Sequence, residues 1–155
     1  MKLLKVKRVA LLAAAVMVST VLITASSPPS SACGSNTWYL PEGYTGGGFD
    51  TWVLLQNPNP WDAEAEVIFL TENGPTEPLV KDLPPSSRTT IKVDDQPGLA
   101  DAPVSTMVKA TSGVVVERAM YFTYPGGRAG GSDSIGANYT SRSWYLAEGY
   151  TGGGF

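Results

Sequence analysis

The sequence predicts an all-β protein: an immunoglobulin-like antiparallel β-sandwich of seven to eight strands, preceded by a signal-peptide helix. Glycine (17 residues) and proline (12) are abundant in the 155-residue chain, and charged residues make up only 16% of it. Short apolar runs alternate with turn signals about every 8–12 residues, which is typical of sandwiches. After the leader, no segment carries an apolar pattern of helical period over a useful length.

The first 32 residues have the three regions of a secretory signal peptide. Four basic residues lie within positions 2–8, an apolar run extends from Val9 to Ala25, and small residues precede position 33. This order predicts export, and hence an extracellular or cell-surface location. The alternative is an uncleaved membrane anchor, for which a run of 17 residues, 9–25, lies at the short limit.

Cys33 is the only cysteine and directly follows Ala32. A lone thiol forms no disulfide within its own chain, so in an exported protein it needs another explanation. One is lipid attachment at Cys33, since Ser31-Ala32-Cys33 fits the small residues of a bacterial lipobox. The others are plain cleavage nearby and a disulfide to a cysteine elsewhere. We expect contact with a membrane only through the leader or a lipidated Cys33.

The expected strands occupy most of the chain after the leader. They lie at 37–40, 49–56, 63–70, 79–83, 87–95, 104–110, 114–124 and 134–137. The period of two is clearest in 63–70, where Ala65, Val67 and Phe69 share one face. Residues 112–113 predict a turn between the two long strands, and the glycine-rich segment 126–131 predicts a loop.

A twelve-residue segment occurs twice. Residues 38–49 read WYLPEGYTGGGF and residues 144–155 read WYLAEGYTGGGF, so eleven of twelve positions match at an offset of 106 (144 − 38). Such self-similarity indicates a repeat array, and the period suits one sandwich domain. The expected organisation is a signal peptide at 1–32, a short linker at 33–37, a sandwich repeat module at 38–143 and the truncated start of a second repeat at 144–155.

The second copy is too short to bury its own Trp144, Tyr145 and Leu146. We therefore expect the chain to be a fragment of a longer protein. Because the two copies are nearly identical, residues 144–155 compete for the groove that residues 38–49 occupy. The tail is expected to be disordered or to pair with another molecule.

These motifs resemble an uncharacterised immunoglobulin-like repeat found in tandem in large secreted and surface proteins of bacteria, especially actinobacteria. The matching motifs are WYLPEG at 38–43, LQNP at 55–58, VDD at 93–95, VVERAMYF at 115–122 and GGSDSIGA at 130–137. The resemblance implies the sandwich fold and a secreted or surface location. Ala119 replaces a frequent proline and Ser132 a frequent histidine, so a metal or ligand bound by that histidine would be lost here.

The composition argues against several classes of function and of partner. The chain has no histidine, the commonest general base and metal ligand. Without the four basic leader residues, seven basic residues (11 − 4) face 14 acidic ones, which argues against nucleic acid as a partner. We expect no catalytic residues, no cofactor and no metal, and a non-enzymatic extracellular structural or adhesion repeat module. Its expected partners are neighbouring repeat domains and a cell-surface glycan or protein.

The alternative function is a carbohydrate-binding module of a secreted enzyme or wall protein. Trp61, in a proline-flanked loop, is the best candidate for a ligand contact, although aromatic residues also fill sandwich cores and seams between domains. Glu42 and its counterpart Glu148 are either sugar ligands or catalytic acids, or else each ends a strand or pairs with Arg118 or another arginine.

Two further groups of charged residues have alternative explanations. Glu117 and Arg118 are adjacent in an apolar strand, so one of them must face inward or toward a neighbouring domain. Asp94, Asp95 and Asp101 lie in or beside one loop and form either a calcium site or a solvated turn.

Overall fold

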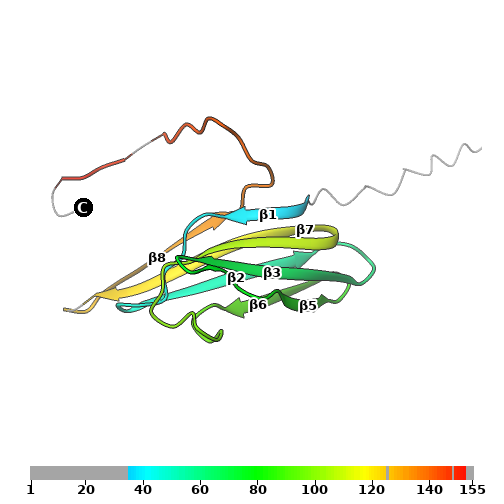
Figure 1. Cartoon of the computed structure of the whole chain (residues 1–155), viewed down its shortest axis with the longest axis horizontal. Helices are drawn as coiled ribbons and strands as arrows, with labels where there is room; N and C mark the ends of the chain where they lie inside the picture. Colours follow the sequence, from blue (N-terminus) through cyan, green and yellow to red (C-terminus); the bar gives the residue numbers. More distant parts are fainter. Residues whose placement is uncertain (1–34, 125, 148, 153–155) are drawn as a thin grey trace, which may run out of the picture.

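The computed structural model describes residues 35–124, 126–147 and 149–152 (Figure 1). The predicted leader and Cys33 lie outside these residues. Eight strands form the fold: β1 Ser35–Leu40, β2 Phe49–Asn57, β3 Ala63–Thr71, β4 Gly74–Pro75, β5 Leu79–Leu83, β6 Ser87–Lys92, β7 Ser105–Tyr124 and β8 Arg128–Ile135. All their pairings are antiparallel. The predicted all-β sandwich is confirmed, and β1 begins inside the expected linker 33–37.

The described residues contain no helix, and therefore none that is long and apolar enough to cross a membrane. The sheet is continuous through β7 and folds into two layers. In one layer, residues 105–110 of β7 lie between β1 and β3, and β4 and β5 follow the far edge of β3. In the other layer, residues 115–124 of β7 pair with β2 and β8, and β6 follows β2. The long strand β7 thus joins both layers.

The turn predicted at residues 112–113 is wrong, because β7 continues through it as one strand of 20 residues. Side chains hold the backbone where β7 passes between layers. The carbonyl of Gly113 accepts a hydrogen bond from Asn59 Nδ2 at 2.8 Å, and that of Val114 accepts one from Trp38 Nε1 at 3.0 Å. The register between β1 and β7 also changes here, since Thr37 pairs with Lys109 whereas Ser35 pairs with Val114.

The loop predicted at 126–131 is also partly wrong, since β8 begins at Arg128. Gly130 and Gly131 lie within this strand because rings of β7 cover them. A Cβ atom on Gly130 would lie 2.7 Å from the Phe122 ring, and one on Gly131 would lie 2.8 Å from the Tyr121 ring. Glycine here serves close packing between neighbouring strands.

The core lies between the two layers and includes the predicted face of β3: Ala65, Val67 and Phe69 are at most 2% exposed. Its other buried apolar residues come from all the longer strands except β8, and from the loop after β6: Trp38, Leu40, Val53, Leu55, Ala63, Leu83, Ile91, Val93, Leu99, Val104, Val108, Val114 and Val116. Burying one large side chain contributes about 1.5–3 kcal/mol before entropy is counted.

Candidate functional site

The first copy of the repeated segment forms β1 and the loop that follows it. Trp38 and Leu40 are buried in the core. The Trp38 indole donates hydrogen bonds to the carbonyls of Ser35 and Val114, both at 3.0 Å. The bond to Val114 attaches β1 to β7 where that strand passes between the layers, so the start of the repeat is part of the core.

The loop after β1 is fixed by contacts with a distant loop. The Tyr44 hydroxyl donates to Asp101 at 3.2 Å, and its ring meets Phe49 edge-on with centroids 5.6 Å apart. A Cβ atom on Gly46 would collide with Asp101, and one on Gly48, whose φ is +87°, would lie 2.5 Å from the Thr123 carbonyl oxygen. Packing therefore accounts for Tyr44, Gly46 and Gly48 of the YTGGG segment, and the positive φ of +61° favours glycine at position 47.

Arg118 is the inward-facing member of the Glu117–Arg118 pair and is 8% exposed. Its guanidinium donates to Ser132 Oγ at 3.0 Å and lies 3.8 Å from the Glu42 carboxylate. The predicted pairing of Glu42 with Arg118 is thus confirmed. Ser132 takes part in this structural contact.

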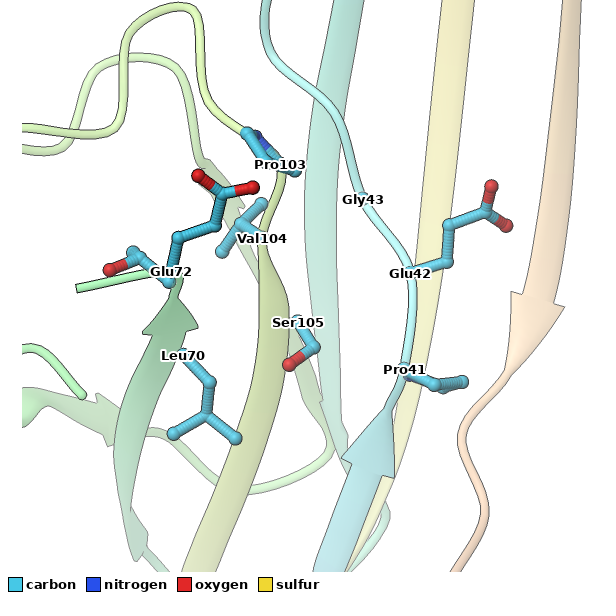
Figure 2. Close-up of a pocket in the computed structure, with 9 residues that line it drawn as sticks. Pro41, Glu42, Gly43, Leu70, Glu72, Pro103, Val104 and Ser105 are labelled. Atoms are coloured by element: carbon cyan, nitrogen blue, oxygen red, sulfur yellow. The ribbon is translucent and has the colours of Figure 1, made fainter. Parts of the chain in front are cut away.

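A cleft of about 380 Å³ lies beside Glu42, between the loop after β1, the end of β3 and the start of β7. Its lining includes a second carboxylate, Glu72. Figure 2 shows the two side chains on opposite sides of the cleft, with Glu42 directed away from Glu72. A glycosidase needs two carboxylates facing one bond, and this cleft does not provide that arrangement.

Two of the three candidate calcium ligands, Asp94 and Asp101, serve different structural contacts. Asp94 accepts a hydrogen bond from the Thr51 backbone N–H at 3.0 Å, while Asp101 accepts the one from Tyr44. The described residues contain no group of three or more acidic, cysteine or histidine side chains placed to hold a metal ion. The calcium alternative therefore has no ligand set in this part of the chain.

Trp61 lies in the loop between β2 and β3 and is 51% exposed. Its indole N–H donates to Ser112 Oγ at 3.3 Å, and its carbonyl accepts a hydrogen bond from Asn57 at 2.9 Å. Among the described residues, no second aromatic ring stacks on it. The ring is accessible, and its role as a ligand contact stays a prediction.

Two buried asparagines organise this same end of the sandwich, and the sequence analysis missed them. Asn57 Nδ2 donates to the carbonyls of Trp61, Leu83 and Pro84, while Asn57 Oδ1 accepts from Asn59. Both asparagines are at most 1% exposed. The Asn-Pro-Asn-Pro pattern at residues 57–60 by itself indicates only a turn, and the polar cluster adds the link between that turn and β7.

The second copy of the repeat follows the sandwich directly. The chain leaves β8 and pairs through Ala137 with Tyr39 of β1, by hydrogen bonds of 2.8 and 2.9 Å (Figure 1). Beyond this bridge, the described residues form no strand. Trp144, Tyr145 and Leu146 are 53%, 94% and 89% exposed, whereas Trp38 and Leu40 are buried.

An apolar cavity of about 450 Å³ lies between the edge of β1 and this second copy. Tyr39, Pro41 and Ala137 line its sandwich side, and Tyr139 and Trp144 its other side. The Tyr139 and Trp144 rings are stacked, with centroids 5.3 Å apart and planes 14° apart. Aromatic groups thus gather where one repeat meets the next.

Comparison with known proteins supports the fold alone. No family model matches the sequence, and no curated protein matches it. The structure is similar to the crystal structure of Thermotoga maritima 1070, with a TM-score of 0.59 and 19% identity over 68% of this chain and 95% of that one. The Anabaena sensory rhodopsin transducer also matches, with a TM-score of 0.47 and 21% identity over 54% of this chain and 93% of that one.

Proposed function

We propose that this chain is an exported, non-enzymatic structural or adhesion protein, and that its sandwich is one module of a tandem array. The observation that carries the proposal is the contrast between the two copies of the repeat. The first copy supplies β1 and buries Trp38, while the second exposes the equivalent Trp144 directly after the sandwich. The sequence that opens the module therefore occurs again directly after the folded module.

The surface around the second copy supports a neighbouring module as partner. The cavity beside β1 is lined largely by apolar atoms of Tyr39, Tyr139 and Trp144. Exposed apolar surface of this kind marks interaction sites, and a following module would cover it. The resemblance to tandem bacterial surface repeats and the charged, apolar leader support export to the cell surface.

Completing the second module tests the tandem arrangement. Residues 50–143 are fused after Phe155, so that the twelve-residue segment has its own β7. We expect amide exchange at residues 144–146 to slow toward that of residues 38–40, because both segments then pair with a β7 strand. Exchange at 144–146 as fast as in the unfused chain would contradict the proposal.

Export is tested separately, by fractionating bacteria that express the full chain or a variant lacking residues 2–25. We expect the full chain in the surface or medium fraction and the variant in the cytoplasm. Equal retention of both inside the cell would contradict export.

Carbohydrate binding is the second candidate function, because Trp61 presents a half-exposed indole in a loop. Aromatic faces stack on sugar rings, although one ring alone gives little affinity. Titration across a panel of polysaccharides with the wild type and Trp61→Ala decides this point. Binding that is lost in Trp61→Ala supports the candidate, and flat titrations with both proteins remove it.

A further inference from the structure

We propose that residues 141–152 bind in the β1 position of a second copy of this chain, and so link molecules head to tail. The proposal rests on the duplicated segment and on the place beside β7 that β1 occupies, which we call the slot. It does not depend on export or on a surface role. The sequence identifies the occupant of the slot. Within each molecule β1 fills the slot, and nearly the same sequence recurs in residues 141–152, which we call the tail.

Residues 141–144 of the tail already make the local side-chain hydrogen bonds of residues 35–38. In β1, Ser35 Oγ donates to the Thr37 carbonyl at 2.9 Å and accepts from the Thr37 N–H at 3.2 Å, and Trp38 Nε1 donates to the Ser35 carbonyl at 3.0 Å. The corresponding residues 106 positions later are Ser141, Ser143 and Trp144, with serine in place of Thr37.

The same three hydrogen bonds form there. Ser141 Oγ donates to the Ser143 carbonyl at 2.9 Å and accepts from the Ser143 N–H at 3.2 Å, and Trp144 Nε1 donates to the Ser141 carbonyl at 3.1 Å. In addition, β1 makes tertiary contacts, among them the bond from its indole to Val114 and its backbone pairing with β7. Part of the ordering that binding requires is therefore complete before contact, which favours association.

The slot accepts the residues that the tail supplies. It holds an indole at Trp38, a leucine at Leu40 and a glycine at Gly43, where a Cβ atom would lie 3.1 Å from the Val104 carbonyl oxygen. The tail carries Trp144, Leu146 and Gly149 at the corresponding positions. Three positions differ, because Arg142, Ser143 and Ala147 replace Asn36, Thr37 and Pro41. None of the three residues replaced is buried in the first copy, so the differences fall outside the core.

The exchange replaces a set of contacts by a nearly identical set, so its net free energy is small. The tethered β1 of the recipient competes at an effective concentration of the order of millimolar. We therefore expect little exchange in dilute solution and more when β1 is weakened. Because each molecule offers one tail and one slot at different surfaces, the contact is heterologous and allows chains to grow.

Disulfide trapping tests the register directly. Tyr39 pairs with Met107 of β7, so a tail in the slot places Tyr145 opposite Met107. Donor chains carry Tyr145→Cys, and recipient chains carry Met107→Cys with Trp38→Ala to weaken their own β1. Both carry Cys33→Ser. The matched recipient has Val80→Cys, on the exposed side of β5 in the same layer, and a second donor adds Trp144→Ala.

We expect mixed disulfides with Met107→Cys to form at least about tenfold faster than with Val80→Cys, because only the slot brings the two Cα atoms within disulfide range. We also expect the Trp144→Ala donor to lose this preference. Equal rates for the two recipients overturn the proposal. Recipients that keep Trp38 are measured in parallel at high concentration, so unfolding of Trp38→Ala does not hide the result.

A chain carrying both Tyr145→Cys and Met107→Cys separates exchange between copies from replacement within one molecule. Linked dimers whose share rises with concentration support the proposal. A monomeric disulfide at every concentration overturns it. Failure of export or of tandem folding would leave these crosslinking rates unchanged, so the two proposals fail separately.

Discussion

The indole N–H of Trp38 is hydrogen-bonded to the carbonyl of Val114 at 3.0 Å, across 76 residues of sequence. This bond lies where β7 passes between the two layers, and it attaches β1 to both halves of that strand. Trp144 makes the local counterpart of the other Trp38 bond, to the carbonyl three residues before it. The two tryptophans therefore share one local hydrogen bond and differ in their tertiary contacts, which makes them matched sites for mutation.

We expect Trp38→Phe to lower the free energy of unfolding by about 1–3 kcal/mol, because it leaves the buried Val114 carbonyl without its donor. Trp144→Phe is the control and should change it by less than about 0.5 kcal/mol, since the Trp144 side chain is exposed. Urea unfolding followed by circular dichroism measures both. Equal losses in the two variants would contradict the different roles given to them.

Asn57→Ala should be more damaging than most single substitutions. Asn57 is fully buried and its side chain bonds to three carbonyls and to Asn59, so alanine leaves several polar groups unpaired at a cost of about 3–5 kcal/mol. Asn73→Ala, in the exposed turn after β3, should be nearly neutral. Thermal unfolding of both variants measures the difference. A small shift for Asn57→Ala would show that water replaces its bonds.

Gly48→Ala and Gly127→Ala separate backbone strain from collision. Both glycines have positive φ, of +87° and +81°, but only at Gly48 would the new Cβ meet a backbone oxygen, that of Thr123. We expect a loss of about 1–2 kcal/mol for Gly127→Ala and about 2–5 kcal/mol for Gly48→Ala. Denaturant unfolding of the pair provides the measurement, and similar losses would show that the Gly48 loop relaxes.

Arg118→Met should change the free energy of unfolding by less than about 1 kcal/mol, because removing a buried charge offsets the loss of its partners. The Ser132 hydroxyl is exposed and can bond to water instead. Glu42→Gln should also cost less than about 1 kcal/mol, since its carboxylate is 71% exposed and 3.8 Å from the guanidinium. A loss above about 3 kcal/mol for Arg118→Met would mean that the arginine determines the fold at this edge.

Stability should fall at alkaline pH. The Asp101 carboxylate raises the pKa of Tyr44 above its usual 10.0, and the hydrogen bond to Asp50 raises that of Lys92 above 10.5. A raised folded-state pKa gives a stabilising contribution that is present below the unfolded value and is lost as pH rises through the folded one. Unfolding measured between about pH 8 and 12 should therefore show a shallower decline in Tyr44→Phe than in the wild type. Identical slopes would contradict the Tyr44–Asp101 contact.

Most of the fold follows from local sequence patterns. The alternation of Ala65, Val67 and Phe69 predicts β3 and its buried face, and the structure agrees. The continuity of β7 depends on distant partners, since Trp38 and Asn59 hold the segment that Ser112 and Gly113 would otherwise turn. A pattern within one window contains no information about such partners, so the predicted turn was wrong.

The same limit applies to the candidate sites. The exposure of Trp61 follows from its proline-flanked loop. The opposite charges of Glu42 and Arg118 made their contact, between the loop after β1 and the interior of β7, one of the alternatives. The buried role of Asn57 depends on carbonyls of residues 83 and 84, which no local motif indicates. Likewise, β8 runs through Gly130 and Gly131 because of rings on the neighbouring strand.

Because β1 and β7 are far apart in sequence, they are synthesised at different times, and this determines the order in which the strands can pair. A chain made from its N-terminus releases Trp38 first, and β1 has no strand to join until residues 105–114 have been synthesised. Closing so long a loop is slow, because contacts between distant segments form late. The second copy, from Trp144, appears only after β7 is complete. The first copy therefore reaches the slot before its competitor exists, and any later replacement must wait for β1 to detach.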